Sequence, residues 1–338
     1  MAYITLNKKS FFSNLDIIAK ATKSIDKIAL VFKDNAYGHG LEQMASLAKE
    51  YGIKKIVVCS DSEAKRAQNY FEYVLVLAAI PTVKSKKIRY AINTLESICK
   101  FPKGTLVELK VDTGMHRNGV KIDELKEAFG KIKDAGLILQ AVFTHHKSAD
   151  MLSSEWFWQN ENFKKVKRIS KTLTKEFGFE VLRFHSANSA SLFRQSDFNE
   201  DMARVGMVVY GCMQLPSALH VEGFKPVLSL YANKNSSREL KKGDKIGYGG
   251  ICEMHEDAIV SNYDFGYGDG FLRTCSNNYK TPQNIRLLGR ISMDNSTFLT
   301  DKEELLIFDD ARKIAEFCKT VSYEVLTSLK ADIKRNIV

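Results

Sequence analysis

The sequence lacks the features that define several large classes of protein. No apolar stretch approaches the roughly 18–20 residues that a membrane-spanning helix needs. The first nine residues, MAYITLNKK, contain no apolar segment of the kind that secretory signals carry. No low-complexity linker or internal repeat interrupts the 338 residues. These absences predict a globular protein of the cytoplasm that has no membrane partner.

Cysteine is also scarce, and its placement excludes the usual metal and disulfide patterns. The 6 cysteines are scattered singly and none forms a C-x-x-C pair. We therefore expect neither a zinc site nor a disulfide framework, but reduced cysteines that pack in the interior. The same pattern predicts that no metal is bound.

Nucleic-acid recognition lacks support as well, although the chain is basic. The formal net charge is +10, but no basic run alternates with aromatic residues. The lysines between residues 164 and 175 recur at the spacing of a solvated helix face. We expect this charge to confer solubility and to attract small anions, with no nucleic acid as a partner.

What the sequence does contain is an alternation of short apolar runs and helical patterns. The runs cover residues 28–33, 55–59, 73–78, 89–93, 105–111, 139–145, 181–186 and 204–210. Nearly continuous apolar runs are typical of parallel strands that are buried on both faces. Helical spacing over 122–135 and 155–177 separates the later runs. The alternation predicts an α/β fold with an N-terminal (β/α)8 TIM-like barrel, and an open doubly wound sheet fits it equally.

The pattern changes near Pro216. From about residue 220, turn-rich segments separate short strand-like runs, and helical patterns at 309–319 and 323–330 follow. We predict a barrel domain over residues 1–217 and a mostly β C-terminal domain over 218–338. The first eight or so residues are expected to pack with the C-terminal domain.

Lys33 is the first candidate for chemistry. It ends the apolar run 28–32, and reactive residues of barrels lie at the carboxyl ends of strands. A lysine that is desolvated in a pocket becomes a usable nucleophile or base, whereas one at a strand end often reaches into solvent. The residues alone leave both interpretations open.

Segments spread over nearly the whole chain resemble, in the same order, the alanine racemase family, pyridoxal-phosphate enzymes of fold type III. They are 33–40 (KDNAYGHG), 109–117 (LKVDTGMHR), 143–145 (FTH), 185–189 (HSANS), 203–207 (ARVGM), 266–271 (GYGDGF) and 289–294 (GRISMD). An ordered set of this kind is far more specific than any single segment. By this resemblance, the chain would bind pyridoxal 5'-phosphate.

The resemblance implies a catalytic pair and a partner for the cofactor ring. Lys33 would hold the cofactor and act as one acid/base, and Tyr267 from a second subunit would act as the other. Arg204 would face the pyridine nitrogen, and His145 would hydrogen-bond Arg204. A guanidinium stays protonated, so the ring would remain a weak electron sink and favour proton exchange over transamination.

The resemblance also assigns the remaining contacts. Those to the cofactor phosphate would come from Tyr37, Ser189, Gly206 and Met207. Arg117 and Met293 would meet the substrate carboxylate, and Lys110 resembles a lysine that is carbamylated in many members. Two positions depart from the family: Asp34 replaces the usual alanine, and Ala331 replaces a tyrosine that contacts the phosphate.

The predicted function is the interconversion of L-alanine and D-alanine by a cytoplasmic homodimer with shared active sites, which would supply D-alanine for peptidoglycan. Two alternatives stay open. One is a racemase of broader specificity that acts, for example, on serine. The other is a non-catalytic protein that binds pyridoxal phosphate, although such single-domain proteins lack the β-rich second domain that carries Tyr267.

Overall fold

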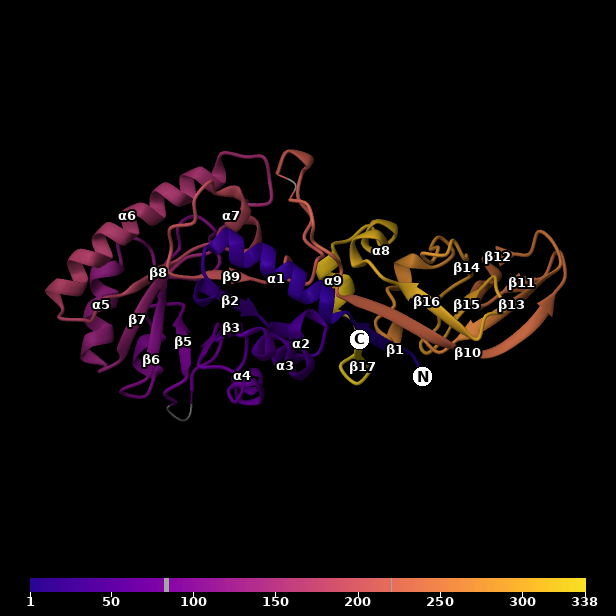
Figure 1. Ribbon diagram of the computed structural model, residues 1–338, viewed down its shortest axis with the longest axis horizontal. Coiled ribbons are helices and arrows are strands. Elements are labelled where there is room, and N and C mark those ends of the chain that lie inside the picture. The colour runs from indigo at the N-terminus through magenta and orange to yellow at the C-terminus, as the bar shows by residue number, and fades with distance from the viewer. Residues whose placement is uncertain (82–84, 220) are drawn as a thin grey trace.

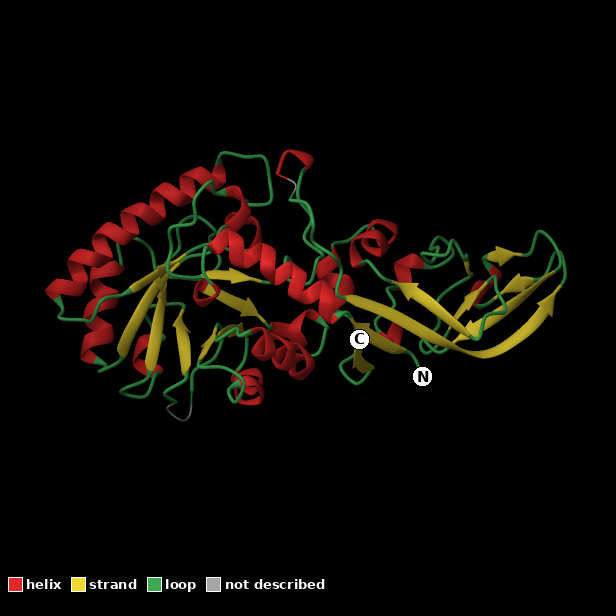
Figure 2. Ribbon diagram, viewed as in Figure 1, coloured by secondary structure: helices red, strands yellow, loops and turns green. Residues whose placement is uncertain are grey.

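Two units lie end to end along the long axis of the protein (Figure 1). The structure is a computed structural model that describes residues 1–81, 85–219 and 221–338. An eight-stranded parallel sheet with its helices forms the first unit, and a mainly antiparallel sheet forms the second (Figure 2). Within these ranges, no helix combines the length and the apolar character needed to cross a membrane.

The parallel sheet curves into a nearly closed barrel. Its strands are β2 (Ile28–Val31), β3 (Lys55–Val58), β4 (Tyr73–Val76), β5 (Ile88–Ile92), β6 (Leu106–Lys110), β7 (Ile138–Phe143), β8 (Arg183–His185) and β9 (Ala203–Val205). Their order is β8-β7-β6-β5-β4-β3-β2-β9, so the last strand returns to the first. A doubly wound sheet would instead reverse its order at a switch point. The predicted barrel is confirmed, and the open sheet is excluded.

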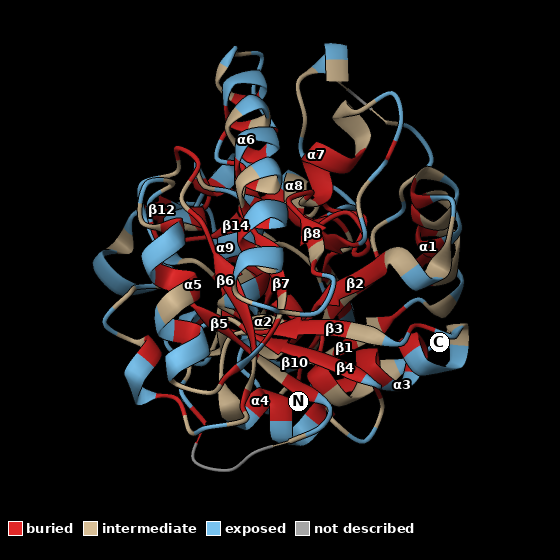
Figure 3. Cartoon of the chain, turned by 90° about the vertical axis from the view of Figure 1, so that its left-hand side faces the viewer, coloured by how far each residue is buried: buried red, intermediate tan, exposed pale blue. Residues whose placement is uncertain are grey.

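Amphipathic helices surround the barrel and leave its strands buried at the centre (Figure 3). They are α1 (Lys8–Thr22), α3 (Leu41–Tyr51), α4 (Asp61–Ala67), α5 (Leu125–Asp134), α6 (Glu155–Glu176) and α7 (Ser189–Arg194). In α5 the buried residues are Leu125, Ala128, Phe129 and Ile132, the spacing of one apolar helix face. A capping box between Ser60 and Glu63 fixes the start of α4.

The second unit is built on a seven-stranded sheet, as the predicted mostly β domain requires. Its strands are β1 (Tyr3–Leu6), β10 (Leu228–Leu240), β13 (Ala258–Tyr263), β14 (Leu287–Leu288), β15 (Ser296–Phe298), β16 (Glu304–Phe308) and β17 (Lys334–Ile337), with β11 (Lys245–Ile246) and β12 (Cys252–Glu253) as a separate pair. Helices α8 (Ala311–Cys318) and α9 (Ser322–Thr327) follow β16. β1 pairs with both β10 and β17. The boundary between residues 217 and 218 stays a prediction.

Each barrel strand ends one to five residues before the end of the apolar run that predicted it, and two of these early ends shape the site. β2 stops at Val31, and Lys33 begins the short segment α2 (Lys33–Tyr37). β9 stops at Val205, and Gly206 opens a turn. In both places the chain leaves the sheet to form part of the pocket described below. Apolar composition alone does not mark such exits, because turn residues beside a pocket are buried like strand residues.

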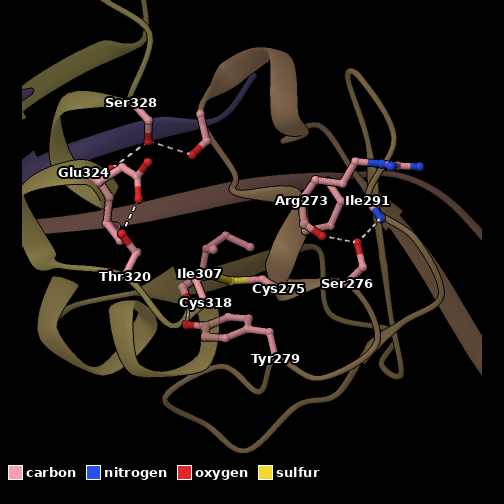
Figure 4. The surroundings of a disulfide bond; sticks show 12 residues. Arg273, Cys275, Ser276, Tyr279, Ile291, Ile307, Cys318, Thr320, Glu324 and Ser328 are labelled. Atoms are coloured by element: carbon pink, nitrogen blue, oxygen red, sulfur yellow. Dashed lines mark hydrogen bonds between the residues drawn. A yellow bond between two sulfur atoms is a disulfide. The ribbon is translucent and has the colours of Figure 1, made fainter.

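The expectation that all six cysteines are reduced is wrong for one pair. Cys275 and Cys318 form a disulfide that links the turn η6 (Arg273–Cys275) to the end of α8 (Figure 4). The partners are 43 residues apart, so only the fold brings them together and no local spacing could reveal them. The other four cysteines are free. No group of residues suited to a metal ion occurs in the described ranges.

Removing this disulfide is expected to lower the free energy of unfolding by about 4 kcal/mol, the chain-entropy value for a closed loop of 43 residues. The double variant Cys275→Ser, Cys318→Ser can be compared with the wild type by denaturant unfolding, with Cys99→Ser as the matched control at an exposed free cysteine. A thiol titration of denatured, unreduced protein should find the 4 free thiols. Finding all 6 would contradict the disulfide.

Candidate active site

A pocket of about 430 Å³ opens at the carboxyl ends of the barrel strands. It brings together all the site residues that the sequence predicts within the barrel: Lys33, Tyr37, Lys110, Arg117, His145, Ser189, Arg204, Gly206 and Met207. These residues come from segments that are far apart in the chain. A larger cleft of about 620 Å³ beside β1 and β17 contains none of them.

The two predicted residues of the second unit lie outside this pocket. Tyr267 and Met293 are 43% and 56% exposed, and neither lines the pocket. Their segments are held together, because the Tyr267 N–H donates to the Ser292 carbonyl at 3.0 Å and the Gly268 N–H donates to the Met293 carbonyl at 2.8 Å. One chain therefore brings together the predicted residues of the barrel and leaves the two predicted residues of the second unit exposed.

The segment after Lys33 has an unusual backbone that carries the chain along the pocket wall. Four consecutive residues, Asp34 to Tyr37, have φ between 50° and 55°, a left-handed turn. This conformation costs about 1–2 kcal/mol for each residue that is not glycine, and such strain concentrates at functional sites. The turn places both Lys33 and Tyr37 in the pocket wall. The Lys33 Nζ lies 4.0 Å from Asp34 Oδ2, so the unusual carboxylate at residue 34 adjoins the lysine.

Tyr37, Ser189 and Gly206 form a cradle of hydrogen-bonding groups with room for an anion. The Ser189 Oγ accepts the Gly206 N–H at 3.0 Å, and a Cβ at Gly206 would stand 3.0 Å from the Tyr37 Oη. Glycine therefore lets the Tyr37 hydroxyl lie close to the backbone at this point. Burial raises the pKa of Tyr37 far above its usual value, so its hydroxyl keeps its proton and can donate. The N–H of Met207 makes no hydrogen bond within the described residues.

Arg204 is held so that one donor remains for a ligand. Its Nη1 donates to the Nδ1 and the carbonyl of His185, and its Nη2 donates to the carbonyls of Thr144 and Ser186. The Nε–H has no partner in the part of the chain that the structure describes, and the side chain lines the pocket. Burial lowers the pKa of Arg204 to about 10, so the group is still a cation at neutral pH.

The prediction that His145 hydrogen-bonds Arg204 is wrong, because the partners of Arg204 are His185, Thr144 and Ser186. The structure gives this bond to His185, to which the sequence analysis assigns no role. The reason is geometric, because His185 ends β8, which is the neighbour of β9 and its Arg204 across the seam of the barrel ring. His145 instead lines the pocket, where burial and then the charge of Arg204 lower its pKa well below the usual value.

Comparison with known proteins identifies the family of this chain. Family models of the alanine racemase N-terminal and C-terminal domains match residues 6–214 and 227–337. The chain belongs to the alanine racemase family. A curated alanine racemase of a Nitratiruptor species is 43% identical over 99% of both chains, and one of Campylobacter curvus is 40% identical over 100% of both.

Solved structures show the same fold at lower identity. An alanine racemase from Bacillus anthracis, crystallised with bound L-Ala-P, has a TM-score of 0.88 and 23% identity, over 100% of this chain and 95% of that one. A histidine racemase from Leuconostoc mesenteroides subsp. sake has a TM-score of 0.84 and 23% identity, over 100% of this chain and 98% of that one. Membership of the alanine racemase family makes the protein an enzyme, and the non-catalytic alternative falls away.

The family pattern also draws attention to a pocket residue that the sequence did not reveal. Tyr323 of α9 lines the pocket, and its ring meets that of Tyr37 edge-on at 5.9 Å between centroids. Ala331, which by the resemblance takes the place of a phosphate-contacting tyrosine, does not line the pocket. Gly38 permits the approach of α9, since a Cβ there would meet the Leu326 carbonyl oxygen at 1.9 Å.

Proposed function

We propose that this member of the alanine racemase family interconverts L-alanine and D-alanine with pyridoxal phosphate, with Lys33 and Tyr267 as the two acid/bases. The observation that carries the proposal is the convergence of Lys33, the anion cradle and the uncommitted Arg204 donor in one pocket. The D-alanine would serve peptidoglycan synthesis in the cytoplasm.

The residues of the pocket fit the cofactor at three points. Tyr37, Ser189 and the backbone at Gly206 and Met207 would hold the phosphate. The Arg204 Nε–H would donate to the pyridine nitrogen, and the Lys33 amine would bond to the aldehyde carbon. When bound, pyridoxal phosphate supplies an electron-accepting ring that stabilises the negative charge left on the α-carbon of the amino acid.

The protein's own side chains would then move the protons. Lys33 would remove or return the α-proton on one face of the substrate, and Tyr267 of the partner subunit would do so on the other. Arg117 would bind the substrate carboxylate, with Met293 of the partner subunit beside it. Since Arg204 is a cation with four of its five N–H groups bound within the protein, it would not pass a proton to the ring.

A homodimer with shared sites would complete this pocket. Tyr267 and Met293 are exposed in the single chain, and a second copy would bring them to the mouth of its partner's barrel. Large exposed apolar side chains occur near the mouth, including Met151 and Leu152, and in the second unit, including Tyr248. These are the side chains that such an interface would cover.

Proton exchange in deuterated water tests the function directly. Cofactor-loaded protein is incubated with L-alanine and, in parallel, with L-serine, and the D-enantiomer and α-deuterium are measured. D-Alanine that carries deuterium, with little reaction of serine, is the expected result. Serine is included because a pocket discriminates against one added hydroxyl by only about 100-fold or less. Equal turnover of serine and alanine would favour the racemase of broader specificity. Bound cofactor without exchange would contradict the proposal.

Lys110 is expected to carry a carbamate at alkaline pH. Burial, followed by the charges of Arg117 and Arg204, lowers its pKa to about 8. Above that pH the amine is neutral, and its lone pair attacks the carbon of CO2 and releases one proton. The new anion would pair with Arg117 and orient it. With 13C-bicarbonate, a carbamate NMR signal should grow as the pH rises through 8 and be absent in Lys110→Arg. A signal that persists in that variant would contradict the assignment.

Tyr323 is expected to help hold the cofactor phosphate in place of the family tyrosine that Ala331 replaces. The variant Tyr323→Phe keeps the ring against Tyr37 and loses the hydroxyl, so the dissociation constant of pyridoxal phosphate should rise about tenfold. Equilibrium dialysis gives this constant. Tyr279→Phe is the matched control, because it removes a buried hydroxyl that bonds the Ile307 carbonyl outside the pocket. Equal constants for both variants would refute the role.

A further inference from the structure

A fully buried carboxylate, Glu108 on β6, lies behind the pocket and is not explained by the proposed chemistry. Its Oε1 accepts the hydroxyl of Tyr73 at 2.5 Å and an N–H of Arg183 at 2.8 Å, and its Oε2 lies 2.9 Å from the Nε2 of His185. Burial alone would raise the pKa of Glu108, but the hydrogen bonds and charges of its neighbours outweigh this and lower it below the usual value. The group is therefore a carboxylate and only accepts hydrogen bonds.

The contacts of His185 on both sides of its ring define one tautomer. Because the Glu108 carboxylate has no proton to give, the Nε2 of His185 must carry a hydrogen and donate it. On the other side, Arg204 has only donors, so the Nδ1 of His185 must be unprotonated and accept the Arg204 Nη1–H. Burial lowers the pKa of His185, which keeps the ring neutral. One proton on Nε2 satisfies every partner.

We propose that Glu108 is a positioning residue that fixes the tautomer of His185 and, through it, the orientation of Arg204 toward the cofactor. Carboxylates play this part for histidines in metal sites and catalytic triads, where loss of the orienting group costs function while the histidine remains in place. The inference rests on the proposed role of Arg204 at the pyridine nitrogen and adds a residue that does not touch the ligand.

The substitution Glu108→Gln separates the positioning role from simple packing, because glutamine has nearly the same shape. Two donors, Tyr73 and Arg183, point at the position of Oε1, and only His185 points at Oε2. The amide oxygen therefore occupies the first position, and the NH2 group faces the Nε2 of His185. That nitrogen must then accept, so the ring proton moves to Nδ1. The Nδ1–H of His185 then faces the Nη1–H of Arg204. Because both groups are donors, the hydrogen bond between His185 and Arg204 is lost.

The first readout is the tautomer itself. Protein labelled with 15N-histidine shows by NMR which ring nitrogen of His185 is protonated, with His185→Gln used to assign the signal among the 7 histidines. The wild type should show the Nε2–H form, and Glu108→Gln should show mainly Nδ1–H. Glu108→Asp, which again can only accept, should restore the wild-type form. Tyr73→Phe removes one buried hydrogen bond of Glu108 but leaves the carboxylate, so it is the control for a merely structural effect and should keep Nε2–H.

The second readout is the NMR signal of the cofactor's ring nitrogen. It is measured in protein reconstituted with pyridoxal phosphate that is labelled with 15N at the ring. We expect the ring nitrogen signal to move in Glu108→Gln and to stay in Tyr73→Phe. Pyruvate released per racemisation event should rise about 10- to 100-fold in Glu108→Gln only, because a ring nitrogen freed from Arg204 can take a proton from water and direct the substrate proton to the cofactor.

The outcomes distinguish this inference from the proposed function. If the wild type binds the labelled cofactor at Lys33 but Glu108→Gln keeps the Nε2–H tautomer and an unchanged ring signal, Glu108 is a packing residue and the inference is wrong. If the tautomer changes while the ring signal of bound cofactor does not, the link from His185 to Arg204 is wrong. If the wild type binds no cofactor, the proposed function fails, whereas the tautomer measurement still tests Glu108. Should Glu108→Gln not fold, the tautomer of the wild type and the ring signal of His185→Gln decide. An Nδ1–H form of His185 in the wild type, or an unmoved ring signal in His185→Gln, would contradict the inference.

Discussion

An equimolar mixture of Lys33→Ala and Tyr267→Phe subunits is expected to regain racemase activity that neither variant has alone. If each active site combines Lys33 of one chain with Tyr267 of the other, the mixed dimer contains one site in which both residues are intact. Random exchange makes about half of the dimers mixed, so activity should approach roughly a quarter of the wild-type value. The measurement is D-alanine formation before and after the subunits are dissociated and reassociated together.

Each variant on its own sets the baseline for this experiment. Tyr267→Phe should keep bound cofactor and lose about 10²–10⁴-fold in racemisation in at least one direction, the usual contribution of a general acid or base. Lys33→Ala should lose the covalent attachment of the cofactor. If the mixture stays as inactive as the two variants, Lys33 and Tyr267 do not meet across subunits. Full activity of Tyr267→Phe alone would remove it from the mechanism.

The second large effect is expected at Arg204. Replacing it with glutamate would put a proton donor or acceptor opposite the pyridine nitrogen, and a protonated ring is a stronger electron sink. Pyruvate formation should rise and racemisation should fall, each by about tenfold or more. Both are measured in a single reaction with L-alanine, by coupled assay and by chiral chromatography.

Folding needs a control at this position, because Arg204 satisfies the carbonyls of Thr144, His185 and Ser186. Arg204→Lys keeps the positive charge but loses the planar fork of five donors that binds these carbonyls. A circular dichroism spectrum like that of the wild type, with pyruvate formation raised only in Arg204→Glu, would assign the effect to the ring nitrogen. An unchanged product ratio in a folded Arg204→Glu enzyme would rule out the proposed role of Arg204.

Local patterns predict much of the barrel, and the parts they miss have physical causes. Apolar runs locate all eight strands because both faces of a parallel sheet are buried. They do not mark where β2 ends, since only Asp34 and Asn35 of the left-handed turn after Lys33 are of residue types that adopt positive φ readily. Ala36 and Tyr37, for example, have no such preference.

In the candidate site, too, some residues could be predicted from the sequence and others could not. Family motifs predict the residues that face the pocket, and the structure collects those of the barrel there. They do not predict the supporting contacts. Glu108 and His185 are 77 residues apart and meet only because β6 and β8 flank β7. Tyr323 reaches the pocket only through the placement of α9. Pairings of this kind depend on the closed fold and leave no spacing in the sequence.

The position of β1 has a consequence for synthesis on the ribosome. The strand Tyr3–Leu6 is made first, yet both of its neighbours, β10 and β17, belong to the last third of the chain. The barrel strands, which end at Val205, can pair while translation continues. β1 must wait unpaired until β10 emerges, and its other edge stays open until β17 leaves the exit tunnel. We therefore expect nascent chains to carry an ordered barrel with β1 unpaired, and expect the second sheet to close only once β17 has emerged.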